Sequence, residues 1–248
     1  MKVEPNVVIS EFIVNMKDPF KNADNNNVNI SKAVANQAKS LAEHYVPFYV
    51  LTNANSQEGL AGAHIVHHDL FNHFPNLSLY FHRILMAYEF LQSHPEIKKA
   101  ALTDATDVVM LNYPFDSVKD GILYMGDEPF YIFATQTINI TSITGRPEIK
   151  EINNFIKENA LLQTLNLGVM VGTRAVLLEY LGIMVKIITD TQLAVAQGQP
   201  EYQLSEIEMA LSNYVAYQYF SDRLIHGREV TTVFEGMQKT SSAWFSHK

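Results

Sequence analysis

Asp104 and Asp107 are the residues of this chain whose types and spacing most clearly indicate chemistry. They follow the apolar residues 100–102 (Ala-Ala-Leu) and precede the apolar residues 108–110 (Val-Val-Met). Two carboxylates at the end of a buried strand are costly to desolvate unless something neutralises them. Because hard oxygen ligands suit Mg²⁺ and Mn²⁺, the pattern predicts a divalent-cation site. The alternative is a turn or a helix cap, since aspartate favours both.

Residues 166–172 (Asn-Leu-Gly-Val-Met-Val-Gly) form a second segment that could belong to a site. The apolar pattern predicts a short strand, and Gly168 in its interior would let the backbone approach a ligand closely. Asn166 and Gly168 are therefore candidate contacts for a ligand. A buried strand with two ordinary glycines is the alternative.

A third segment, residues 205–213, has the pattern of a helix start with Glu208 in the first turn. Asn213 lies five residues further on, about 140° around the helix axis. We therefore do not expect Glu208 and Asn213 to face the same ligand. Glu208 could contact a ligand, or it could only complement the positive end of the helix dipole.

Taken together, the three segments resemble the metal-dependent GT-A glycosyltransferases of bacterial type. The pair Asp104 and Asp107 is similar to the D-x-x-D variant of the family's DxD motif, and residues 166–172 are similar to its N-x-G strand. Glu208 takes the acidic position of the family's D-Q-x-A-L-N helix start, although Met209 replaces the amide. The long amphipathic helix with Arg83 that precedes the aspartates also matches the family pattern.

The resemblance implies a role for each residue. Asp104 and Asp107 would bind Mn²⁺ or Mg²⁺, with Asp107 closer to the metal and Asp104 also contacting the donor ribose. Asn166 and Gly168 would contact the sugar or the acceptor, and Arg83 would contact the donor. Glu208 is the candidate catalytic residue, either as a general base or through a hydrogen bond to a donor hydroxyl.

The C-terminal residues also resemble a feature of this family, which often completes its metal site with a histidine near the C-terminus. His247 is accordingly the candidate third metal ligand, with His226 as the alternative, and Lys248 would hold the diphosphate. Because chain termini are commonly exposed, we expect residues 246–248 to bury little surface. Residues 67–69 (His-His-Asp) look structural, since adjacent residues on a strand point to opposite faces.

The pattern of the elements indicates how these residues are positioned. Strand 7–14, helix 31–45 and strand 48–51 begin the chain in the order typical of a parallel sheet. Further helices are expected at 77–91, 149–158, 175–188 and 204–220, with strands at 121–125, 131–134 and 167–171 and a loop at 16–29. We therefore predict an α/β fold, and the resemblance implies a single Rossmann-like GT-A domain over residues 1–248, with a mostly parallel sheet flanked by helices.

Composition excludes several other classes of protein. A net charge of −8 without a Lys/Arg cluster argues against a nucleic-acid partner. The chain has no cysteine and no apolar run of about 18 residues, so no disulfide framework and no transmembrane segment are expected. The acidic N-terminal residues do not read as a signal peptide. We expect a cytoplasmic protein that is at most peripheral to the inner membrane.

By resemblance, the protein is a hexosyltransferase of polysaccharide biosynthesis. It would move a sugar from a nucleotide diphosphate sugar, a UDP-sugar in the favoured case, to a glycan or glycoconjugate acceptor. A nucleotidyltransferase should have a glycine-rich basic loop after the first strand, and residues 16–29 contain no glycine. A non-catalytic sugar-binding protein on the same fold would need the carboxylates to be purely structural.

Overall fold

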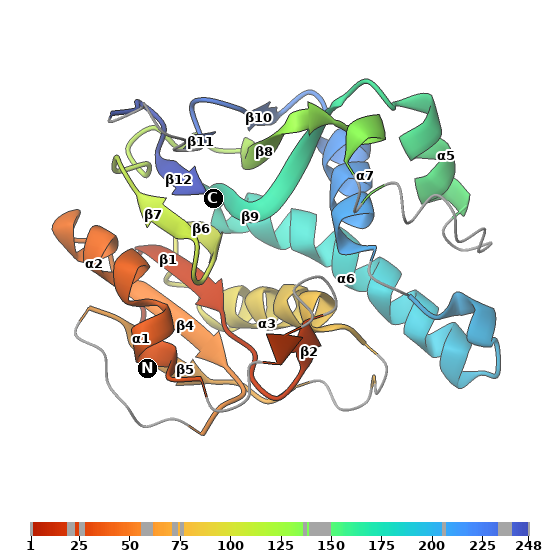
Figure 1. The fold of residues 1–248 in the computed structure, drawn as a ribbon, viewed down its shortest axis with the longest axis horizontal. Helices are drawn as coiled ribbons and strands as arrows, with labels where there is room; N and C mark the ends of the chain where they lie inside the picture. Colours follow the sequence, from red (N-terminus) through yellow and green to blue (C-terminus); the bar gives the residue numbers. More distant parts are fainter. Residues whose placement is uncertain are drawn as a thin grey trace.

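The computed structural model describes residues 2–18, 23–24, 28–55, 62–70, 74, 77–135, 138, 150–204, 207–232 and 240–247. Within them, a seven-stranded sheet has the order β10-β8-β9-β6-β1-β4-β5 (Figure 1). The strands are β1 (Asn6–Glu11), β4 (Phe48–Thr52), β5 (His64–His67), β6 (Lys99–Asp104), β8 (Leu123–Tyr131), β9 (Gln163–Thr173) and β10 (Leu224–His226).

Most strands of this sheet run in the same direction. The pairs β1–β4, β1–β6, β4–β5 and β8–β10 are parallel, whereas β9 runs antiparallel to both β6 and β8. The predicted α/β fold with a mostly parallel sheet is therefore confirmed. The finer assignment to one GT-A domain stays a prediction.

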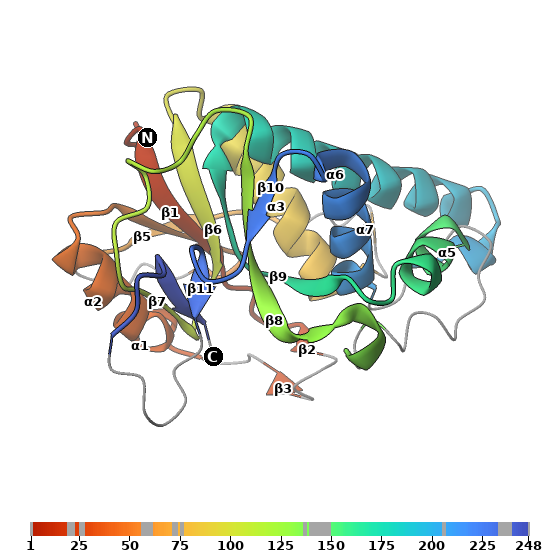
Figure 2. The ribbon, with the colours of Figure 1, turned by 90° about the horizontal axis from the view of Figure 1, so that it is seen from above.

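Helices and a small second sheet cover the two faces of the central sheet (Figure 2). On one face lie α3 (Leu79–Ser93), α6 (Arg174–Ala196) and α7 (Glu208–Phe220), with α5 (Lys150–Glu158) packed against α7. On the other face lie α1 (Ile30–Ala33) and α2 (Ala35–Glu43), together with the three-stranded sheet of β11 (Thr231–Thr232), β12 (Phe245–His247) and β7 (Val108–Met110). Shorter elements are the β2–β3 pair (Lys17–Asp18 and Ala23–Asp24) and 3₁₀ helices at Ile132–Ala134 and Pro200–Tyr202.

The burial of both sheet faces explains the continuous apolar runs in the central strands. In β1, Val7 and Ile9 pack in the core beneath α3 and α6, whereas Val8 packs on the α2 side. In β6, Ala100 likewise packs on the α3 and α6 side, and Ala101 packs on the α2 side. Successive strand residues alternate between faces, so a strand covered on both sides is apolar at most of its positions.

Several expectations about the elements need correction. The predicted helix 31–45 is two helices, α1 and α2, and the predicted strand 7–14 ends at Glu11. The predicted loop at 16–29 contains the short β2–β3 pair. The two strands predicted at 121–125 and 131–134 are one strand, β8, followed by a 3₁₀ turn; a register shift against β9 spans Pro129, which cannot donate a ladder hydrogen bond. The last helix begins at Glu208, not at residue 204. Among the described residues, no helix is both long and apolar enough to cross a membrane.

The topology brings polar residues to one edge of the sheet. Since β1 and β6 are parallel, their final residues, Glu11 and Asp104, lie side by side in register. The chain then turns through residues 105–107 into β7, which pairs antiparallel with β12 near the C-terminus. Ligands of open α/β sheets bind at this carboxyl edge, so the fold places the candidate residues where a site is expected.

Candidate metal centre and adjoining cavity

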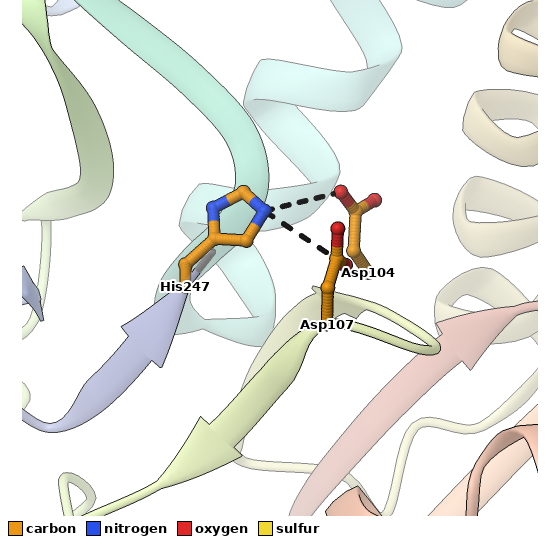
Figure 3. Close-up of side chains that lie close together, drawn as sticks. All are labelled: Asp104, Asp107 and His247. Carbon is orange, nitrogen blue, oxygen red and sulfur yellow. Dashed lines mark ion pairs between the residues drawn. The ribbon is translucent and has the colours of Figure 1, made fainter. Parts of the chain in front are cut away.

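Asp104, Asp107 and His247 converge at the carboxyl edge of β6 (Figure 3). The Nε2 atom of His247 lies 3.3 Å from Oδ2 of Asp104 and 3.9 Å from Oδ1 of Asp107. One ligand atom from each of the three residues lies within 4.8 Å of the others. The structure thus brings together all three residues that the sequence proposed as metal ligands.

Pairing between β7 and β12 delivers the histidine to this cluster. His247 stands opposite Val108, the residue directly after Asp107, in the antiparallel ladder. Ser246 and His247 are only 8% and 6% exposed. The expectation that residues 246–248 bury little surface is therefore wrong, because this end of the chain forms a strand inside the fold. Lys248 itself lies outside the described residues.

Gly168 makes room for the histidine. A Cβ atom added at residue 168 would lie 2.1 Å from Cε1 of His247, which is far inside van der Waals contact. The close approach expected at Gly168 is thus an approach to the imidazole ring. Gly168 lies on β9, the neighbour of β6 in the sheet. Only glycine at this position leaves room for the His247 ring beside the two aspartates.

Arg83, on α3, bridges the ends of β1 and β6. Its Nη2 donates to Oδ1 of Asp104 at 2.5 Å, and its Nε donates to Oε2 of Glu11 at 3.4 Å. Burial alone would raise the pKa of Asp104, but the charges of Arg83 and His247 hold it well below its ordinary value. Asp104 is therefore an anion in the neutral pH range. The donor-binding role of Arg83 stays a prediction, and its guanidinium already binds two carboxylates.

Glu11 is a site residue that the sequence reasoning missed. It is 7% exposed, and its Oε1 atom forms no hydrogen bond with any residue the structure describes. Burial raises its pKa to about 7 against the opposing charge of Arg83. A signal existed in the sequence, because Glu11 is the one charge in the apolar run of residues 7–14.

The cluster has the polar atoms that a divalent cation would satisfy. Oδ1 of Asp107 and Nε2 of His247 are buried, and neither forms a hydrogen bond within the described part of the chain. Buried polar atoms are rarely left in this state, so each such case needs an explanation. Two carboxylates and an imidazole are a usual donor set for a divalent cation. The residues present fit a bound metal ion.

A cavity of about 320 Å³ adjoins the cluster and crosses the carboxyl ends of β1 and β6 and the middle of β9. Asp104, Asp107 and Gly168 line it, together with Glu128, Asn166 and Glu208. Oδ1 of Asn166 accepts from the Gly168 N–H at 2.7 Å, while its Nδ2 donates to Oε1 of Glu128. Glu128 was not predicted; its segment, residues 126–130 (Gly-Asp-Glu-Pro-Phe), shows no periodic pattern.

Glu208 is the first residue of α7 and is only 4% exposed. Asn213, on the same helix, does not line the cavity; it bonds both backbone polar groups of Leu165 and so ties α7 to β9. Glu208 thus faces the cavity and Asn213 faces β9, as their angular separation on the helix predicted. Residues 205–206, which precede this helix, lie outside the described residues.

Three other histidines, His226, His67 and His68, have partners away from the cluster. His226, the alternative third ligand, lies on β10 with its Nδ1 3.0 Å from Oδ2 of Asp127. His67 contacts Asp69, and His68 contacts Glu89. The structure thus places His247, and not His226, beside the two aspartates.

No protein-family model matches the chain, and no curated protein matches it either. The geometry of the site and the resemblance of its motifs are therefore what indicates a function.

Proposed function

We propose that this protein is a metal-dependent glycosyltransferase of the GT-A type, moving a sugar from a nucleotide diphosphate sugar to a glycan or glycoconjugate acceptor. The observation that carries the proposal is the convergence of Asp104, Asp107 and His247 beside a cavity that the two aspartates line. The motif order along the chain supports the same assignment. A UDP-sugar is the favoured donor by resemblance.

The charges that line the cavity favour a metal-dependent reaction. Among the described residues of its wall, Arg83 is the only cation, and it is bonded to Glu11 and Asp104. A diphosphate would therefore find no uncommitted positive side chain there. A bound divalent cation would supply charge neutralisation for the departing diphosphate. Because an imidazole belongs to the donor set, Mn²⁺ suits the cluster better than Mg²⁺, which prefers oxygen ligands.

Three polar residues of the cavity lining suit a sugar. Carboxylate and amide groups of Glu128, Asn166 and Glu208 can bond several hydroxyl groups at once. Glu208 holds a donor hydroxyl in this proposal and thereby orients the anomeric carbon toward the acceptor. The apolar residues Phe12, Ile13 and Leu79, at the β1 end, would face the nucleoside.

A panel of nucleotide sugars tests the proposal. Thermal stabilisation and release of the nucleoside diphosphate should be measured for UDP-, GDP-, ADP- and CDP-sugars, with Mn²⁺ and with EDTA. We expect stabilisation by one nucleotide class only when Mn²⁺ is present. Stabilisation by no nucleotide sugar would contradict the proposal, and release of pyrophosphate from a nucleoside triphosphate and a sugar phosphate would indicate a nucleotidyltransferase.

The pH dependence of the transfer rate distinguishes the two possible roles of Glu208, general base and hydrogen-bond partner of the donor. A general base contributes roughly 10²–10⁴-fold to rate, whereas a hydrogen bond involving a charged group contributes about 1.5–3 kcal/mol. These ranges overlap, so rate loss alone does not distinguish the two roles. We expect Glu208→Gln to slow transfer while keeping the acidic limb of the profile between pH 5 and 9. Loss of that limb would make Glu208 the base.

A further inference from the structure

Helix α2 buries two polar side chains beside an otherwise apolar stripe. Gln37 is 2% exposed and Ser40 is 6% exposed, although Ala38 and Leu41 of the same helix pack into the apolar core. A buried amide is costly unless its polar atoms are bonded. The contacts of these two residues therefore show what α2 does besides packing.

Gln37 bonds the start of the turn that carries the aspartates. In the amide orientation that gives each polar atom a partner, Oε1 accepts from Oγ1 of Thr103 at 2.6 Å. Nε2 then donates to the carbonyl oxygens of Asp104 and Ala105, each at 3.2 Å. Oγ1 of Thr103 lies 2.7 Å from Oγ of Ser10 on β1. One buried network thus joins α2, β1 and the end of β6.

Ser40 bonds the segment after the turn. Its Oγ accepts from the Met110 N–H at 3.1 Å and donates to the Gln37 carbonyl at 2.8 Å. Met110 pairs with Phe245 in the ladder that ends at His247. The two polar residues of α2 therefore hold residues 104–105 and residue 110, on either side of Asp107.

We propose that Gln37 is the positioning residue of the metal centre, fixing the backbone from which Asp104 and Asp107 project, with Ser40 as its weaker counterpart. This inference rests on the proposed metal dependence. Neither side chain lines the cavity, so both act through the turn. Partners that orient metal ligands in this way typically change metal affinity about 10- to 100-fold when removed.

Mn²⁺ titration of the full-length chain by calorimetry tests the inference. Gln37→Met keeps the side-chain size and removes the hydrogen bonds, and we expect it to weaken Mn²⁺ binding about 10- to 100-fold. The matched control is Tyr180→Phe, which removes a buried 2.6 Å hydrogen bond to Ser212 and does not touch the cavity. It should lower the melting temperature and leave Mn²⁺ affinity unchanged. Titrations are run where circular dichroism shows every variant folded.

Ser40→Ala provides a second variant should Gln37→Met fail to fold; it should weaken Mn²⁺ binding about 2- to 10-fold. Transfer by either variant should recover as the Mn²⁺ concentration is raised, which a loss of folded protein alone would not produce. Wild-type Mn²⁺ affinity in both variants would overturn the positioning role while leaving the proposed function standing. A wild-type protein that binds no Mn²⁺ would overturn both.

Discussion

The two edges of the central sheet differ in whether their polar side-chain atoms have hydrogen-bond partners. At the amino edge, Lys99 donates to the carbonyl of Phe115, and Arg174 donates to the carbonyl of Leu91 at 2.7 Å. At the carboxyl edge, Oε1 of Glu11, Oδ1 of Asp107 and Nε2 of His247 are buried without a hydrogen bond to any described residue. The two amino-edge cations thus have hydrogen-bond partners, whereas these three carboxyl-edge atoms have none among the described residues, although Arg83 pairs with Asp104 and Glu11 beside them.

This difference separates structural charges from site charges. A buried polar group costs free energy unless it is paired, so a protein keeps unpaired ones chiefly where a ligand supplies the partner. The two edges also make opposite predictions for mutation. Removing a charge at the amino edge should cost stability, whereas removing one at the carboxyl edge should cost ligand binding.

Asp107→Ala should have the largest effect on binding. Removing a residue that only orients a metal ligand lowers metal affinity by up to about 100-fold. Removing Asp107, a direct ligand in this proposal, should therefore weaken Mn²⁺ binding by at least about 100-fold. The melting temperature should equal or exceed that of wild type, because one of two neighbouring carboxylates is removed. Calorimetric titration and thermal unfolding in EDTA measure the two quantities.

Arg174→Ala is the counterpart at the amino edge. It should leave Mn²⁺ affinity unchanged and lower the free energy of unfolding by about 1 kcal/mol, since the carbonyl of Leu91 loses its donor. If Arg174→Ala weakened metal binding as much as Asp107→Ala, the contrast between the edges would not hold.

Gly168→Ala should have the next largest effect. The new Cβ would lie 2.1 Å from the His247 ring, so the ring must move and Mn²⁺ binding should fall about 10- to 100-fold, with about 1–3 kcal/mol of lost stability. Gly172→Ala, on the same strand, is the control, because its nearest contacts would be 3.5 Å away. Equal Mn²⁺ affinities in the two variants would show that His247 is not a ligand.

Glu11→Gln should change the pH dependence of stability. Burial raises the folded-state pKa of Glu11 to about 7 from 4.5, so the folded protein holds this proton at pH values where the unfolded chain has lost it. The wild type should therefore lose stability as the pH rises from about 4.5 through 7, and Glu11→Gln should not. In EDTA, the stability of Glu11→Gln relative to wild type should rise by about 3 kcal/mol between pH 4 and pH 8, because a pKa difference of about 2.5 units is worth about 1.36 kcal/mol per unit. If the stability of wild type and of Glu11→Gln changed with pH in the same way, the raised pKa of Glu11 would be contradicted.

Local patterns predicted much of this fold and the centre of its site. The apolar runs of β1, β4 and β6 were readable because both sheet faces are covered, and the spacing of Asp104 and Asp107 indicated a cation site. Glu128 and Gln37 were not found, because their roles depend on contacts with β9 and with the β6–β7 turn, far away in the sequence. The burial of His247 was missed for the same reason: it follows from the β7–β12 pairing, which no short-range pattern encodes.

The central claim is that Asp104, Asp107 and His247 hold one divalent cation. An anomalous difference map from crystals grown with Mn²⁺ tests it most directly. The account predicts a single strong peak bonded to a carboxylate oxygen of each aspartate and to Nε2 of His247. A map with no peak among these three side chains, or with the Mn²⁺ bound elsewhere, would contradict it.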